Sequence, residues 1–263
     1  SDPLFTAGYI GVNGGMVLVV ADDPGIYSSQ NEQDTRMIAR AAMVPVVEPS
    51  DSEEARYFTK RAYELSEKYD TPVILRTTTR LAHSQGIVNL EDRVEVDDKP
   101  YERNIAKNVM MPGNAIKRHV IVEQRLKKMA EDACDLDINK VEYNDTKIGV
   151  ITSGIPYQYV KEALPNASVL KLGLVHPLAK GLIKEFASKV SLRIGMYKTK
   201  EIFKYDIQKH LMAMIDSIFE DTYLKKLSQK AFFDYAEKCY NIQQDHIDYL
   251  KQNPPDIPIP PEL

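Results

Sequence analysis

The chain of 263 residues is long enough for one large or two ordinary domains. Its 34 Lys and Arg residues are interleaved with 38 Asp and Glu residues, which gives a net charge of −4 and no basic block. This pattern argues against nucleic-acid binding and against attachment to an acidic membrane. No apolar stretch approaches the roughly 20 residues that a membrane-spanning helix needs. The two cysteines, Cys134 and Cys239, lie far apart, as is typical of ordinary thiols in a reducing cytosol.

Strand and helix patterns alternate through residues 1–82. Continuous apolar runs such as Met16–Val20 indicate strands that are covered on both faces. Such alternation predicts right-handed βαβ units and a parallel sheet. In chain order, we expect a helix at 3–14 that ends at Gly14-Gly15, a strand at Met16–Val20, a helix at Asp34–Ala42, a strand at Val44–Val47, a helix at 49–70 and a strand at 71–79.

The predicted helix at 49–70 carries the clearest helical signals of the chain. Ser50 and Glu53 form a capping-box pattern at its start. Its apolar residues repeat at the spacing of one helix face: Phe58, Ala62, Leu65 and Tyr69.

A polar connector and a second α/β run follow. Residues 83–115 have no stable period, and the segment 83–140 is expected to consist of a connector and one helix. The residues that mark this helix are His119, Val122, Leu126, Met129 and Ala133. A separate parallel-sheet domain is expected at about 140–190, from a strand at Ile148–Thr152, a helix at Pro156–Ala163, a strand at Ser168–Leu172 and a helix at Pro177–Lys189. The remainder, 205–263, is expected to be helical with an extended proline-rich end.

The stretch "SSQNEQDTR" follows a predicted parallel strand, at the edge of the sheet where ligands bind in open α/β folds. Its amides, carboxylates and guanidinium could hold a polar substrate or contact a neighbouring domain. The alternative is a self-satisfied surface loop, in which Asp and Ser make local turns. The candidate residues are Ser28, Ser29, Gln30, Asn31, Glu32, Gln33, Asp34 and Arg36.

For the other residues that could bind a ligand or take part in catalysis, a structural role is favoured. The turn Thr152–Gly154 follows a strand and could present a backbone amide, but Ser and Gly often serve turn geometry. Arg76, Arg80 and the threonines between them could meet an anion. Three histidines have no adjacent Cys or metal-like partner in the sequence: His83, His119 and His176. Four glycines do not match the dinucleotide-binding pattern and are expected to serve helix packing and capping: Gly8, Gly11, Gly14 and Gly15. The sequence therefore assigns no catalytic residue and no metal ligand.

Four segments carry a family resemblance: "DPLFTAGYIGVNGGMVLVVADDPGIYSSQNEQDTR", "EPSDSEEA", "TPVILRTTTRLAHS" and "KLGLVHPL", in this order. On these segments, residues 1 to about 190 resemble the large (alpha) subunit of indolepyruvate:ferredoxin oxidoreductases. These are thiamine-diphosphate enzymes of the 2-oxoacid:ferredoxin oxidoreductase superfamily. One departure lies inside the candidate loop region, where Ile26-Tyr27 replaces the family's usual Met-His.

The resemblance implies a partial pyrimidine-side thiamine domain at 1–82 and a shortened domain similar to the transketolase C-terminal domain at 141–204. It implies oxidative decarboxylation of aryl pyruvates such as indolepyruvate to aryl-acetyl-CoA. Thiamine diphosphate with Mg²⁺, 4Fe–4S clusters and coenzyme A would take part. The implied partners are a beta subunit and ferredoxin, in the cytoplasm.

The resemblance also indicates an internal fragment that is inactive alone. The family's activating glutamate, its Cys-Pro-Gly-Cys-Pro-His run and its cluster cysteines have no counterpart here. A segment after "EFASKV" is expected to be lost. Two alternatives stay open: a subunit of another 2-oxoacid:ferredoxin oxidoreductase, such as a pyruvate enzyme, and a non-catalytic interaction module of the same fold.

Overall fold

The computed structural model describes residues 2–96 and 99–196. The described residues all lie in one compact unit of the chain. The helical segment and proline-rich tail predicted at 205–263 lie outside the described residues, as does Cys239. No helix among the described residues is long and apolar enough to cross a membrane.

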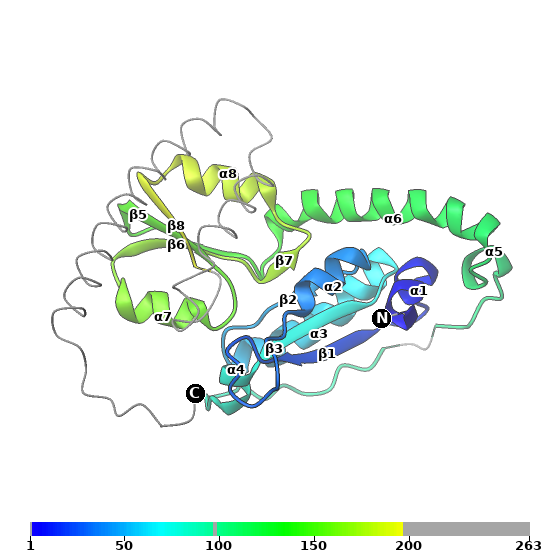
Figure 1. Ribbon diagram of the computed structural model, residues 1–263, viewed down its shortest axis with the longest axis horizontal. Helices are drawn as coiled ribbons and strands as arrows, with labels where there is room; N and C mark the ends of the chain where they lie inside the picture. Colours follow the sequence, from blue (N-terminus) through cyan, green and yellow to red (C-terminus); the bar gives the residue numbers. More distant parts are fainter. Residues whose placement is uncertain (1, 97–98, 197–263) are drawn as a thin grey trace, which may run out of the picture. The chain divides into compact units, whose positions relative to one another are not determined.

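The first sheet has the strand order β1-β3-β2-β7 (Figure 1). The strands β1 (Val17–Asp22), β3 (Val73–Thr78) and β2 (Val46–Val47) are parallel, as the alternating pattern predicted. The fourth strand, β7 (Leu174–His176), is antiparallel to β2. Because three parallel strands end at one edge, the residues that follow β1 and β2 lie close to the end of β3.

Four helices precede, connect or follow the three parallel strands. They are α1 (Asp2–Ile10), α2 (Thr35–Ala41), α3 (Ser52–Tyr69) and α4 (Thr79–His83). The predicted end of the first helix at Gly14-Gly15 was wrong, because α1 ends before Gly11, whose φ of 81° stops the helix. Gly8 packs against the Ala42 carbonyl oxygen, in agreement with the packing role expected for it.

The cap of α3 lies one residue later than the sequence predicted. Asp51 is the N-cap, and its carboxylate accepts a hydrogen bond from the Glu54 N–H at 2.8 Å. The Glu54 carboxylate in turn accepts from the N–H and the hydroxyl of Ser50. The Ser50/Glu53 pairing was therefore wrong, because Asp51 and Glu54 have the same three-residue spacing and take these roles.

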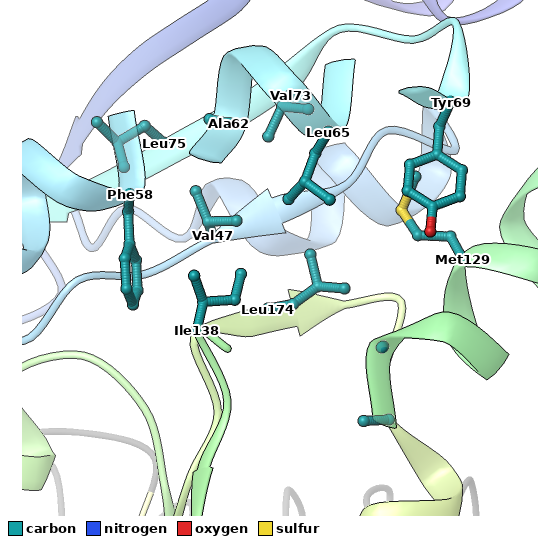
Figure 2. Close-up of a cluster of buried hydrophobic side chains, with 12 residues drawn as sticks. Val47, Phe58, Ala62, Leu65, Tyr69, Val73, Leu75, Met129, Ile138 and Leu174 are labelled. Carbon is teal, nitrogen blue, oxygen red and sulfur yellow. The ribbon is translucent and has the colours of Figure 1, made fainter. Parts of the chain in front are cut away.

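The main core forms on the face of α3 that the periodicity predicted. Phe58, Ala62, Leu65 and Tyr69 are all at most 5% exposed. Figure 2 shows the cluster they form with residues of the two neighbouring strands and of later segments. Its labelled members are Val47, Phe58, Ala62, Leu65, Tyr69, Val73, Leu75, Met129, Ile138 and Leu174. Each large side chain buried here contributes about 1.5–3 kcal/mol to folding.

The connector holds no helix or strand in its described residues between 84 and 104. Next come α5 (Ile105–Asn108), α6 (Pro112–Asp132) and the 3-10 turn η1 (Ala133–Asp135). Of the residues predicted to mark this helix, Val122, Met129 and Ala133 are buried, whereas His119 is exposed and Leu126 is half-buried. The face of α6 toward α1 instead buries Arg118 and Arg125, which donate hydrogen bonds to the carbonyls of Tyr9 and Gly8.

A second sheet has the order β4-β6-β5-β8. Its strands are β4 (Lys140–Glu142), β6 (Ala167–Lys171), β5 (Asp145–Thr152) and β8 (Leu192–Met196), and the helices α7 (Pro156–Ala163) and α8 (Lys180–Ser188) belong to this part of the chain. The predicted parallel pairing of β5 and β6 is confirmed. The sequence did not predict β4 and β8.

One strand of the segment 140–190 belongs to the first sheet, and the domain boundaries expected from the sequence stay a prediction. β7 follows β6 along the chain but pairs with β2 of the first sheet. The Glu48 N–H also donates to the Gly173 carbonyl at 2.8 Å. The two sheets are therefore joined by backbone as well as by side-chain contacts.

Candidate functional site

Charged side chains gather where the parallel strands of the first sheet end. Asp22 closes β1, Glu48 follows β2, and Arg76 lies on β3. All three are at most 4% exposed. Ions this deeply buried require partners, since an unpaired charge is costly to remove from water.

Arg76 supplies the central pairings. Its Nε donates to the Asp22 carboxylate, and its Nη1 donates to Glu48 Oε1 at 2.8 Å. Its Nη2 lies 3.8 Å from Asp34 Oδ1 and has no hydrogen-bond partner among the described residues. Arg76 thus connects the residues that end β1 and follow β2.

Residues 23–34, called here the polar loop, begin with a tight turn around Asp23. The Asp23 carboxylate accepts backbone hydrogen bonds from Tyr27 at 3.0 Å, Ser28 at 2.7 Å and Ser29 at 2.9 Å. Burial works to raise the pKa of Asp23, but the three N–H donors outweigh it and hold the pKa well below its usual range. The first half of the polar loop is therefore fixed by its own backbone.

The polar loop is also fixed where it ends. Asp34 is the N-cap of α2, and its carboxylate accepts from Nε and Nη2 of Arg36, both at 2.8 Å. Thr35 donates to Asp22 from its backbone N–H at 2.8 Å and from its hydroxyl at 2.6 Å. Burial alone would raise the pKa of Asp34, but the arginine pairing lowers it to about 2.

Five side chains form one connected set, called here the arginine–carboxylate network: Asp22, Asp34, Arg36, Glu48 and Arg76. Arg36 joins it through Nη1, which lies 3.5 Å from Glu48 Oε1. Because three carboxylates share two guanidiniums, each carboxylate has an arginine partner inside the protein.

The structure divides the eight predicted site residues into two groups. Ser28 and Ser29 bind Asp23, and Asp34 with Arg36 belongs to the network. The intervening Gln30, Asn31 and Glu32 are exposed and Gln33 is half-buried. Within the described part of the chain, the carboxamides of Gln30, Asn31 and Gln33 make no hydrogen bond. The self-satisfied turn weighed from the sequence fits the ends of the polar loop, and the role of its middle stays a prediction.

The second sheet reaches the network through Ser153, in the turn Thr152–Gly154 that the sequence had singled out. The Ser153 hydroxyl donates to Glu48 Oε2 at 2.9 Å. Gly154 has a φ of 54°, a conformation that glycine adopts most readily. A cavity of about 30 Å³ remains here, enough for about one water molecule. It is lined by Pro24, Arg36, Glu48, Pro49, Arg76, Thr78, Ser153, Gly154, Ile155 and Pro156.

Sequence reasoning did not include Asp22 or Glu48 among the site residues, and for Arg76 it weighed an anion partner against a structural role. The signal was present in "VILRTT", where an arginine interrupts an apolar strand of a parallel sheet. Such an arginine demands a counterion, and the chain supplies two of its own carboxylates.

The remaining candidates lie apart from this network. His83 is exposed, and His119 Nδ1 lies 2.7 Å from the Tyr9 hydroxyl. His176 is inaccessible at Nε2, and burial together with Arg40 lowers its pKa to about 4. The Arg80 guanidinium lies 4.7 Å from the centre of the Tyr27 ring.

The described residues do not fit the cofactors of the resembled family. They contain no group of three or more His, Cys, Asp or Glu side chains that could hold a metal ion. The network carboxylates are already paired with arginines. A 4Fe–4S cluster needs four thiolates, whereas the whole chain has two cysteines.

The fold belongs to the class of 2-oxoacid oxidoreductase folds. The structure superposes on 2-oxoglutarate:ferredoxin oxidoreductase from Magnetococcus marinus with a TM-score of 0.51 at 15% identity, over 73% of this chain and 42% of that chain. At this identity the likeness concerns the fold alone. No protein-family model matches the chain.

Three curated relatives identify the family more closely. The indolepyruvate oxidoreductase subunit IorA of Archaeoglobus fulgidus is 42% identical over 72% of this chain and 32% of its own length. That of Methanothermobacter marburgensis is 41% identical over 82% and 36%, and that of Pyrococcus horikoshii is 34% identical over 100% and 44%. The chain belongs to the family of indolepyruvate oxidoreductase IorA subunits, and it spans less than half the length of these relatives.

Proposed function

We propose that the chain is part of the large subunit of an oxidoreductase that converts aryl pyruvates, indolepyruvate among them, to aryl-acetyl-CoA. The observation that carries the proposal is the 34–42% identity to IorA subunits. In the overall reaction, the aryl pyruvate and coenzyme A yield aryl-acetyl-CoA, CO₂ and one proton, and two electrons reduce two ferredoxins. The proposal includes a beta subunit as partner and places the protein in the cytoplasm.

The polar loop is proposed to line the substrate cleft. Its two ends are fixed by Asp23 and by the arginine–carboxylate network, which limits the entropy that the loop loses when substrate binds. The carboxamides of Gln30, Asn31 and Gln33 offer both donors and acceptors to the carboxylate and carbonyl of a 2-oxoacid. Thiamine diphosphate with Mg²⁺ and the 4Fe–4S clusters are proposed to bind elsewhere in the complete protein.

The test is an assay of the complete protein, purified with its partner subunit. Reduction of ferredoxin is followed with coenzyme A and, in turn, indolepyruvate, phenylpyruvate, pyruvate and 2-oxoglutarate. The proposal expects kcat/KM for the two aryl pyruvates to exceed that for the other acids by at least about tenfold, since filling an apolar pocket gives a discrimination of this order.

Two other outcomes correspond to the alternatives that the sequence left open. A preference for pyruvate would assign the chain to another 2-oxoacid enzyme. An assembled, cofactor-loaded complex that reduces no ferredoxin with any of the four acids would support a non-catalytic module of the same fold.

A further inference from the structure

The hydrogen bond from Ser153 to Glu48 links the second sheet to the polar loop by a continuous series of short contacts. Glu48 accepts from Ser153 at 2.9 Å and from Arg76 at 2.8 Å. Ser153 and Glu48 are 5% and 3% exposed. With little water to compete, both hydrogen bonds act at low dielectric and are strong.

The series continues to both ends of the polar loop. Arg76 binds Asp22, the residue directly before the loop, and Asp22 accepts two hydrogen bonds from Thr35, the residue directly after it. Arg36 binds Asp34 and lies 3.5 Å from Glu48. A shift of the Glu48 carboxylate therefore moves the partners of both loop ends together.

Two other contacts between these parts of the chain end at α3 rather than at the polar loop. Gln158 of α7 donates to Asp51 at 3.2 Å, and Lys171 of β6 binds Glu54. Both acceptors lie at the N-terminus of α3. Ser153, in the turn that follows β5, thus connects the second sheet to the network by a side-chain hydrogen bond.

We propose that Ser153 and Glu48 are positioning residues, which set the orientation of the polar loop from the second sheet. The expected effect of these residues on catalysis rests on the proposed function. Ser153 and Glu48 themselves need not touch the substrate. Their loss leaves every loop side chain present but displaces it, and small misplacements at a reacting centre can cost up to 100-fold in rate.

The experiment compares Ser153→Ala with Ser168→Ala in the complete complex. Ser168 is a matched control, because it is 0% exposed and its hydroxyl also bonds within the second sheet, to Asn144 and Asp145. Gln158→Ala is a second control that removes a contact between the sheets without reaching the network. Ser153→Thr keeps the hydroxyl and tests rescue.

The proposal expects Ser153→Ala to lower kcat for an aryl pyruvate about tenfold, with KM changed less than about twofold. Both controls should keep kcat within about twofold, and Ser153→Thr should recover most of the loss. Equal kcat in Ser153→Ala and Ser168→Ala, with an active wild type, would overturn the proposal.

A second measurement separates this inference from the proposed function. Hydrogen exchange reports the backbone N–H groups of Tyr27, Ser28 and Ser29, which donate to Asp23. In Ser153→Ala these amides should exchange at least about fivefold faster than in Ser168→Ala, whether or not the complex turns over aryl pyruvates. An inactive wild type would defeat the proposed function, whereas unchanged exchange would defeat the positioning role.

Discussion

At the scale of single residues, the buried charges decide how the polar loop is held. Asp22, Glu48 and the two guanidiniums of the network are removed from water, and Asp34 is partly so, so their attraction mainly repays the cost of desolvation. Their benefit is therefore geometric: each Arg–carboxylate pair has a preferred orientation and fixes the segments it joins.

Asp34 provides a test of this network through pH. Its pKa is lowered from 3.8 to about 2, so between these values the folded state binds fewer protons than the unfolded state. Its contribution, about 2 kcal/mol, is complete above the unfolded pKa and is lost as the pH falls toward 2. Asp34→Asn should be less stable than wild type at pH 7, and this difference should shrink below pH 4. Denaturant unfolding at several pH values measures it, and a difference that stays constant would contradict the prediction.

His176 gives the opposite case, a base that is kept neutral. Its pKa is lowered from 6.5 to about 4 by burial and by the nearby charge of Arg40, so the unfolded state binds the proton more tightly. Stability should fall as the pH drops from 6.5 toward 4, and His176→Gln should lack this part of the decline. Melting curves of the two proteins between pH 7 and pH 4.5 provide the comparison. Parallel curves would show that His176 does not titrate in this window.

At the scale of elements, the end of a helix can depend on a single backbone position. Gly11 ends α1 with a φ of 81°, and a Cβ there would meet the Asp70 carboxylate. That carboxylate also accepts from the Val12 N–H at 2.9 Å and pairs with Lys107. One glycine therefore permits the end of α1 to approach Asp70, the C-cap of α3 and a partner of Lys107 in α5.

Gly11→Ala should consequently destabilise the protein by about 2 kcal/mol, from the left-handed backbone and the displaced carboxylate. Gly14→Ala is the matched control, since a Cβ at Gly14 has no atom within 4 Å. The control should change the free energy of unfolding by less than about 0.5 kcal/mol. Similar losses in both variants would show that Gly11 has no special role.

The sequence predicted those elements whose signal is local. Apolar runs marked β1 and β3, and the helical spacing of Phe58 to Tyr69 marked the buried face of α3. It missed elements that depend on distant partners. β7 is three residues long and is defined by its pairing with β2, and β4 begins with a charged lysine. For the same reason the sequence did not predict the role of Glu48. This role depends on hydrogen bonds from Arg76 and Ser153, which are distant in the sequence.

At the scale of the whole molecule, the two sheets share one structural unit. The main core combines residues of α3 and β3 with Met129 of α6 and Leu174 of β7 (Figure 2). The chain nevertheless spans less than half the length of its IorA relatives. The polar loop, whose carboxamides make no hydrogen bond within the described residues, is therefore proposed to face residues or ligands supplied by the complete enzyme.

The central claim is that the polar loop belongs to a substrate cleft, and substitution of Asn31 and Gln33 by Ala in the complete complex tests it most directly. Neither carboxamide makes a hydrogen bond among the described residues, so the melting temperature should change by less than about 2 °C. Turnover of aryl pyruvate should fall at least about tenfold, because each lost hydrogen bond to a charged substrate costs about 1.5–3 kcal/mol. Full activity together with a melting temperature lowered by several degrees would contradict the account and make the polar loop a structural brace.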